Sequence, residues 1–164
     1  HEFGLADRYE EELAACDAMV AELVTRLPAG TAIVVTADHG QVHVGDQLID
    51  LPQSVTRLVD GQSGEARFRW LHARAGSAGD LLEAAHEAFD AVGWVRSVDE
   101  VVTAGWLGPE VTAVARARLG DVAVLARDPV AFVDPAEAMS FHLIGRHGSM
   151  TVDEMLVPAL AVVT

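Results

Sequence analysis

The sequence predicts an α/β protein in which a small α+β part is inserted into a doubly wound sheet, and three observations lead to that prediction. Residues 7–27 carry apolar side chains at helical spacing, and the short apolar strand pattern of residues 31–37 follows. A second apolar strand pattern covers residues 159–163. Residues 66–133 mix strand and helix patterns, so we expect them to form an insert between pieces of the main sheet.

The first helix and strand are expected to belong to the main sheet. Pro28-Ala29-Gly30 ends the helical pattern. Residues 31–37 are apolar on both faces, which favours a central parallel strand that helices cover. The single cysteine, Cys16, excludes an internal disulfide, and we expect it to be buried in the helix packing.

The region after this strand changes character. Residues 41–65 look irregular, and a strand pattern with alternating side chains begins at Arg67. We expect this strand to present a solvated basic face opposite the acidic remainder of the chain; the alternative is that it contacts an anionic substrate. The basic residues concerned are Arg67, Arg69, His72 and Arg74.

Two Ser-x-x-acid patterns are typical of capping boxes. They begin at Ser77 and Ser97, and they predict helices to about residues 91 and 104. A short strand is expected at residues 93–96, and one or two helical turns at residues 110–118.

The last part of the insert is predicted to return to strands. Residues 121–126 form a strand pattern with which residues 130–133 are expected to pair. Residues 134–150 look like a loop. A third capping pattern, Thr-x-x-Glu, begins at Thr151 and predicts a short helix before the buried strand at residues 159–163.

These patterns divide the chain into three segments. Residues 1–65 are expected to form one piece of the α/β core, residues 66–133 the insert, and residues 134–164 the return to the core.

Composition excludes some functions. The 164 residues contain 25 Asp and Glu against 11 Lys and Arg, which gives a formal net charge of −14. A nucleic-acid polymer would be repelled, since its binding requires cationic side chains against phosphates. A small phosphate ester is compatible with this charge, because a bound divalent metal dominates the local field. We expect no membrane span and a cytoplasmic location, because no long apolar run or signal peptide pattern is present.

Asp38-His39-Gly40 directly follows the first strand. In a doubly wound sheet, ligands bind beyond the carboxyl ends of the strands. Carboxylate and imidazole both bind zinc, and glycine permits a sharp turn that can bring both to an ion. The alternative is that the tripeptide only closes a turn.

His147-Gly148 is a second candidate, in the loop before the helix predicted at Thr151. A histidine held there can coordinate a metal or simply be solvated. His43 is expected to be exposed or to lie behind the ligands, and His142 has no assigned role.

Two sequence stretches together resemble a known family. Val-Val-Thr-Ala-Asp38-His39-Gly40 and the stretch His147-Gly-Ser-Met-Thr-Val-Asp-Glu-Met-Leu-Val-Pro158 resemble the nucleotide pyrophosphatase/phosphodiesterases of the alkaline phosphatase superfamily, especially bacterial alkaline-phosphatase-like members. His1-Glu2-Phe3-Gly4 matches the His-x-x-Gly half of another motif of that family.

The resemblance implies a pair of zinc ions, or other divalent metals. Asp38 and His39 would hold one, and His147 and His1 would hold the other. Gly40, Gly148 and His43 would contribute behind the ligands or at the substrate.

The resemblance also implies a Thr or Ser nucleophile that forms a covalent phospho-enzyme. In the family it lies N-terminal to the motifs of this chain, so we expect the chain to be a C-terminal fragment that is inactive alone, with metal sites that can be empty. Exposed sheet surface would then favour self-association.

The leading hypothesis is a zinc-dependent phosphodiesterase or nucleotide pyrophosphatase that acts on a small phosphate ester or nucleotide. The alternatives are a non-catalytic binding or assembly domain, or a phosphomonoesterase, sulfatase or phosphomutase of the same superfamily.

Overall fold

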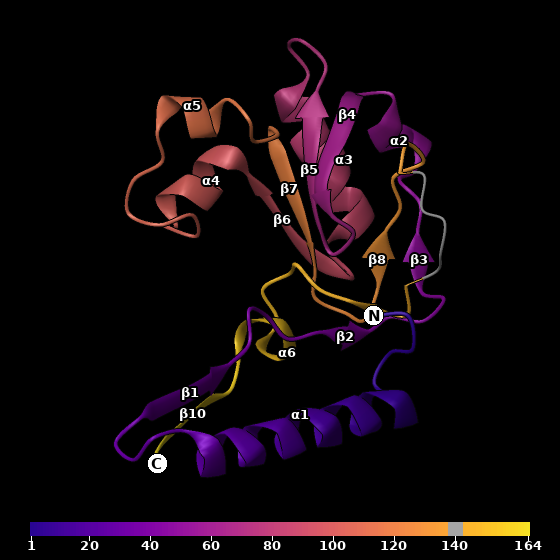
Figure 1. The fold of residues 1–164 in the computed structure, drawn as a ribbon. Coiled ribbons are helices and arrows are strands. Elements are labelled where there is room, and N and C mark those ends of the chain that lie inside the picture. Colours follow the sequence, from indigo (N-terminus) through magenta and orange to yellow (C-terminus); the bar gives the residue numbers. More distant parts are fainter. Residues whose placement is uncertain (138–142) are drawn as a thin grey trace.

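The computed structural model describes residues 1–137 and 143–164, which form two unequal parts (Figure 1). We call them the body, a four-stranded sheet with its flanking helices, and the arm, a long helix beside a two-stranded sheet. His142, to which no role was assigned, lies outside the described residues.

The arm contains α1 (Asp7–Arg26), β1 (Ala32–Thr36) and β10 (Ala159–Val163). β1 and β10 are antiparallel, and no residue of α1 is buried, Cys16 included. β10 is exposed along its whole length. The expectations of a buried Cys16, of a central parallel strand at residues 31–37 and of a buried strand at residues 159–163 are therefore wrong for this chain.

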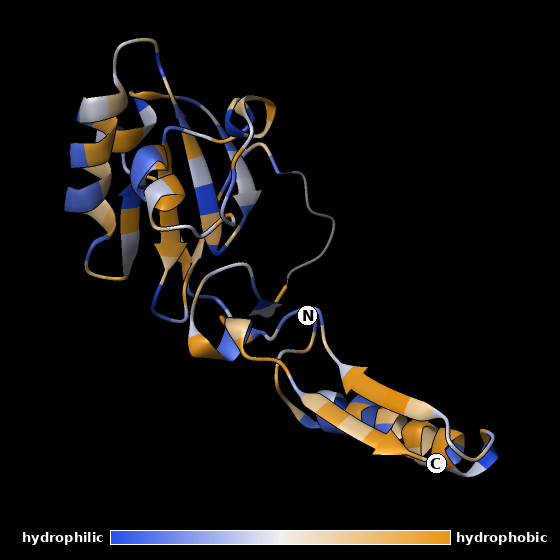
Figure 2. Cartoon of the chain, turned by 90° about the vertical axis from the view of Figure 1, so that its left-hand side faces the viewer, coloured by the Kyte–Doolittle hydropathy of each residue, from blue (hydrophilic) through white to orange (hydrophobic). Residues whose placement is uncertain are grey.

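These strands are exposed because few other elements of the described chain pack against them. α1 runs along the two strands of the arm, which show as a pair of largely apolar arrows in Figure 2. Within the described residues β1 pairs only with β10. An apolar run indicates that a strand can be buried, but what lies against it decides whether it is.

The sheet of the body has the order β4-β5-β7-β6, and all neighbours are antiparallel. Its strands are β4 (Val59–Glu65), β5 (Phe68–Ala73), β6 (Gly93–Ser97) and β7 (Val122–Ala126). The strands predicted from Arg67, at 93–96 and at 121–126 are confirmed. β4 lies in the stretch predicted to be irregular, because its polar, glycine-containing sequence has no apolar alternation and only pairing with β5 makes it a strand.

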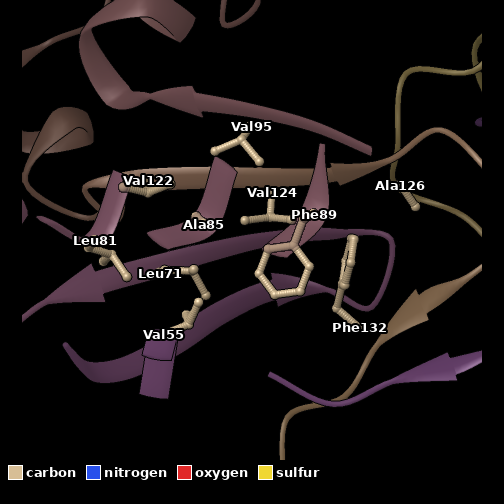
Figure 3. Close-up of a cluster of buried hydrophobic side chains, with 10 residues drawn as sticks. All are labelled: Val55, Leu71, Leu81, Ala85, Phe89, Val95, Val122, Val124, Ala126 and Phe132. Carbon is tan, nitrogen blue, oxygen red and sulfur yellow. The ribbon is translucent and has the colours of Figure 1, made fainter. Parts of the chain in front are cut away.

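Helix α3 (Ala78–Phe89) buries Leu81, Ala85 and Phe89, which lie four residues apart on one face of the helix. They pack with residues of β5, β6 and β7 into the main core (Figure 3). Its fully buried members are Val55, Leu71, Leu81, Ala85, Phe89, Val95, Val122, Val124, Ala126 and Phe132.

The capping patterns have different outcomes. At α4 (Val98–Thr103), Ser97 accepts the Glu100 N–H at 3.2 Å and Glu100 accepts the Ser97 N–H at 2.7 Å, so this capping box is confirmed. Ser77 precedes α3 but makes no capping hydrogen bond through its side chain. That capping box is wrong, although the helix is present.

Short elements complete the body. They are α2 (Gln53–Thr56), α5 (Ala113–Arg116), and the parallel pair β3 (Leu48–Ile49) and β8 (Ala131–Phe132). β8 therefore pairs with β3. The expected pairing of residues 130–133 with the strand at residues 121–126 is wrong. A two-residue strand carries too little pattern to select its partner.

The junction between body and arm is formed by β2 (Val42–His43), β9 (Gly145–Arg146) and α6 (Val152–Met155). β2 and β9 are antiparallel. The boundary at residue 65 stays a prediction, although β4, before it, belongs to the same sheet as β5, after it. None of the helices in the described part of the chain has the length and apolar character that crossing a bilayer requires.

Candidate functional site

Three histidines meet at the junction. His1, His39 and His147 each offer one ring nitrogen, and these nitrogens lie within 4.8 Å of one another. The three residues come from the start of the chain, the turn after β1 and the residue after β9. We call them the histidine cluster.

His1 is held by the segment that leads to His147. Its main-chain carbonyl accepts the N–H groups of Ile144 at 3.0 Å and Gly145 at 2.7 Å, and its ring Nδ1 lies 3.1 Å from the Gly145 carbonyl. The first residue of the chain is thereby fixed to β9.

Hydrogen bonds also settle the tautomers of two rings. His39 Nδ1 lies 2.7 Å from the Gly40 carbonyl, and His1 Nδ1 makes the corresponding contact with Gly145. A carbonyl only accepts, so both Nδ1 atoms must donate. In the neutral rings Nε2 then carries no proton. Metal-binding histidines are typically oriented by such a bond.

The rings pack closely. His39 and His147 stack with centroids 3.6 Å apart, and His1 lies 5.8 and 5.1 Å from them. Burial lowers the pKa of His147, and the neighbouring His39 lowers it further. His147 is therefore biased towards the neutral imidazole, which is the form that binds a metal.

Asp38 lies beside the histidine cluster. Its Oδ1 accepts the His39 N–H at 3.1 Å and lies 3.8 Å from His39 Nε2, while 90% of the side chain is exposed. His43, on β2, is exposed as one of its two readings expected, and it pairs with Gly145 in the β2–β9 ladder.

Glycine is required at positions 40 and 148, which directly follow His39 and His147. Gly148 has φ +112°, and a Cβ there would lie 2.8 Å from the Glu65 Cβ. A Cβ on Gly40 would lie 1.9 Å from the Asp153 carbonyl oxygen. Any other residue would therefore push the histidine loops away from the body or from α6.

Two of the pockets that His1 helps to line are large enough for a small ligand. One of about 310 Å³ includes His1, His147, Arg146 and Glu65 in its wall. The other, of about 300 Å³, includes His1 and His39. Burial lowers the pKa of Arg146, although nearby Glu137 opposes the shift. Each pocket is within the size range of small-ligand sites.

The basic strand differs from expectation. Arg67 and Arg69 are fully buried, and only Arg74 of the three arginines is exposed. Arg67 makes a bidentate ion pair with Glu154 in which both N–O distances are 2.8 Å, and Arg69 pairs with Glu137. The expected solvated face is wrong, because the partner acids lie 87 and 68 residues away and no local pattern reveals them.

Glu154 also departs from its predicted role. The Thr151 hydroxyl donates to its carboxylate instead of capping α6. Burial alone would raise the pKa of Glu154, but hydrogen bonds from Arg67, Thr151 and Ser149 outweigh it and hold the pKa below its usual value. Glu154 is therefore a buried carboxylate that stays ionised.

Comparison with known solved structures supports the fold. Human ectonucleotide pyrophosphatase / phosphodiesterase 5 is 18% identical, with a TM-score of 0.73 over 98% of this chain and 42% of that one. An inactive form of the murine protein in complex with AMP gives 16% identity and 0.70 over 96% and 41%. Phosphonoacetate hydrolase from Sinorhizobium meliloti gives 19% and 0.62 over 88% and 38%. The chain thus spans about two fifths of the length of these structures.

No curated protein matches the sequence. The family described as Type I phosphodiesterase / nucleotide pyrophosphatase matches residues 1–150, which include the whole histidine cluster. The chain therefore belongs to the Type I phosphodiesterase / nucleotide pyrophosphatase family.

Proposed function

We propose that this chain forms the metal-binding part of a zinc-dependent phosphodiesterase or nucleotide pyrophosphatase. The histidine cluster is the observation that carries the proposal. Family membership supports phosphoester chemistry, and the AMP complex of the murine relative supports a nucleotide as the substrate class.

The donor set fits zinc. Imidazole nitrogens bind zinc at about 2.0–2.1 Å, and carboxylate oxygens bind it at similar distances. The cluster supplies three imidazoles, two of them with Nε2 free of a proton, and Asp38 adds an exposed carboxylate beside them. We assign Asp38 and His39 to one ion and His1 and His147 to a second. Two-metal sites have ions about 3.5–4 Å apart, which suits a cluster of this size.

Residues of this chain orient the site. The carbonyls of Gly40 and Gly145 fix the His39 and His1 rings, and the stacked rings of His39 and His147 limit each other's rotation. Arg146 lies in the wall of the pocket next to His1 and His147, where it can face an anionic substrate group. Bound zinc would supply Lewis-acid activation of an attacking oxygen and stabilise charge on the phosphoryl group.

The attacking group is not assigned to this chain. Following the family resemblance, we place a Thr or Ser nucleophile upstream and expect the 164-residue chain alone to show no turnover. Hydrolysis must therefore be measured on the protein with its upstream region, whereas metal binding can be measured on either form.

The test combines zinc content with hydrolysis of an aryl phosphodiester. We expect His147→Ala and Asp38→Ala to lose metal and to lower turnover at least a hundredfold. His86→Ala is the matched control, because His86 pairs with Asp90 on α3, away from the cluster. Unchanged metal content and activity in both site variants would overturn the proposal.

A further inference from the structure

Glu154 connects the two loops that carry His39 and His147. We propose that the buried Arg67–Glu154 pair is a positioning device that holds these two histidines at metal-binding distance. The inference rests on the proposed metal site, and it assigns to Glu154 a role that is neither a metal ligand nor a helix cap.

On the His147 side, the contacts come from the Glu154 carboxylate. The Ser149 N–H donates to Oε1 at 2.9 Å, and the Thr151 hydroxyl donates to Oε2 at 2.5 Å. Ser149 is buried and its hydroxyl also donates to the Ala126 carbonyl at the end of β7. The loop is thus fixed two residues after His147.

On the His39 side, the contact comes from the Glu154 main chain. Its carbonyl accepts the Gly40 N–H at 2.9 Å. The Gly40 carbonyl in turn accepts from His39 Nδ1. A displacement of Glu154 would therefore reach the His39 ring through a single residue.

Arg67 anchors the carboxylate to the body. Its Nε and Nη2 donate to the two carboxylate oxygens, and its Nη1 donates to the carbonyls of Asp128 and Val130 at 2.9 and 2.7 Å. The side chains of Arg67 and Glu154 are 0% and 1% exposed. A bidentate, charge-assisted pair that is fully buried permits little movement.

The carboxylate has no acceptor capacity left. An ionised carboxylate offers about four lone-pair sites. Four donors occupy them, namely Arg67 Nε, Arg67 Nη2, the Ser149 N–H and the Thr151 hydroxyl. The Glu154 carboxylate therefore has a structural role. Its replacement should affect metal binding by moving His39 and His147.

Arg69 and Glu137 provide a matched control. In this second Arg–Glu pair Arg69 lies on β5, directly after the segment of Arg67, and is as buried as Arg67, whereas 40% of the Glu137 side chain is exposed. Its further bonds go to the carbonyls of Phe132 and Gly64. No hydrogen bond of the described residues joins it to the histidine loops.

The first experiment measures zinc affinity of the 164-residue chain by competition with a chromophoric chelator. Loss of outer-sphere partners typically weakens metal binding about 10–100-fold, and we expect a loss in this range for Glu154→Gln. Glu137→Gln should stay within twofold of wild type. If the folded Glu154→Gln protein binds zinc as tightly as wild type, the positioning role is refuted.

The second experiment measures amide hydrogen exchange of Ser149 and Gly40 without metal. Both amides should exchange at least tenfold faster in Glu154→Gln and be unchanged in Glu137→Gln. This readout separates the two proposals, because it tests the connection even if the wild-type chain binds no zinc. Equal exchange in both variants and wild type would overturn the inference.

Thr151→Val keeps the test valid if Glu154→Gln fails to fold. It removes one donor to the carboxylate and leaves the ion pair in place. We expect zinc binding more than twofold weaker, with faster Ser149 exchange. Wild-type values for both quantities would again contradict the positioning role.

Discussion

Strands β7 of the body and β10 of the arm have the same composition and opposite environments. Each contains two valines, two alanines and one leucine. All five residues of β7 are buried, and all five of β10 are exposed. β7 lies between β5 and β6, whereas within the described residues β10 pairs only with β1.

The comparison separates two contributions to a strand. Apolar and β-branched residues make both segments extended, so the sequence predicts both strands. Burial depends on neighbours from distant parts of the chain, and these differ between body and arm. A leucine should therefore contribute much more to stability in β7 than in β10.

The largest effect is expected from Leu125→Ala in β7. Leu125 is fully buried with Trp70, Val101 and Ala123. The substitution leaves a cavity that its packed neighbours fill poorly, and such changes cost about 2–5 kcal/mol. Urea denaturation would measure the loss, and a change below about 1 kcal/mol would mean that the body is loosely packed.

The second-largest effect is expected from acid, which should lower the stability of the body. The pKa of Glu154 is lowered in the folded chain, so its contribution is fully present above the unfolded pKa of about 4.3. It is lost as the pH falls through the lower folded pKa. We expect the melting temperature to fall from pH 5 to pH 3, and to fall less in Glu154→Gln.

The exposed pair of the arm is the control for this acid effect. Arg26 and Glu22 pair on the surface of α1, and such pairs contribute about 0–1 kcal/mol. Glu22→Gln should leave the melting temperature within a degree or two of wild type at both pH values. An equal response in the Glu22 and Glu154 variants would show that burial of the Arg67–Glu154 pair is unimportant.

How far a sequence pattern can be trusted is clear from two similar motifs. Ser97-x-x-Glu100 and Thr151-x-x-Glu154 both predict a capping box, and only the first forms one. Glu154 differs because Arg67, 87 residues earlier, binds its carboxylate. The helix α6 could be predicted from the sequence, but the ion pair between Glu154 and Arg67 could not.

The candidate site shows the same division. The sequence singles out His1, His39 and His147 through motifs, and the structure places their nitrogens within 4.8 Å. Zinc binding at these residues stays a prediction. The His1 Nδ1 bond to Gly145 and the Gly40 N–H bond to Glu154 join residues more than a hundred positions apart, so no local pattern predicts them.

Helix ends extend the comparison with a smaller effect. α4 of the body starts with a complete capping box, whereas the N-cap residue of α1 in the arm is Ala6, which offers no side-chain cap. Ser97→Ala should cost about 1 kcal/mol. Ala6→Ser should add helix content to α1, since Ala6 already has the extended backbone of a cap. Circular dichroism and urea denaturation would measure both, and no loss in Ser97→Ala would mean that solvent replaces the cap.

The smallest effect is expected from Leu160→Ala in β10. It deletes the same atoms as Leu125→Ala, but 64% of Leu160 is already exposed, so little apolar surface returns to water and no closed cavity forms. We expect a change within about 0.5 kcal/mol by urea denaturation of the 164-residue chain. A loss comparable to that of Leu125→Ala would mean that β10 is covered in solution. The leucine pair therefore measures directly whether the arm, unlike the body, leaves its apolar strand open to solvent.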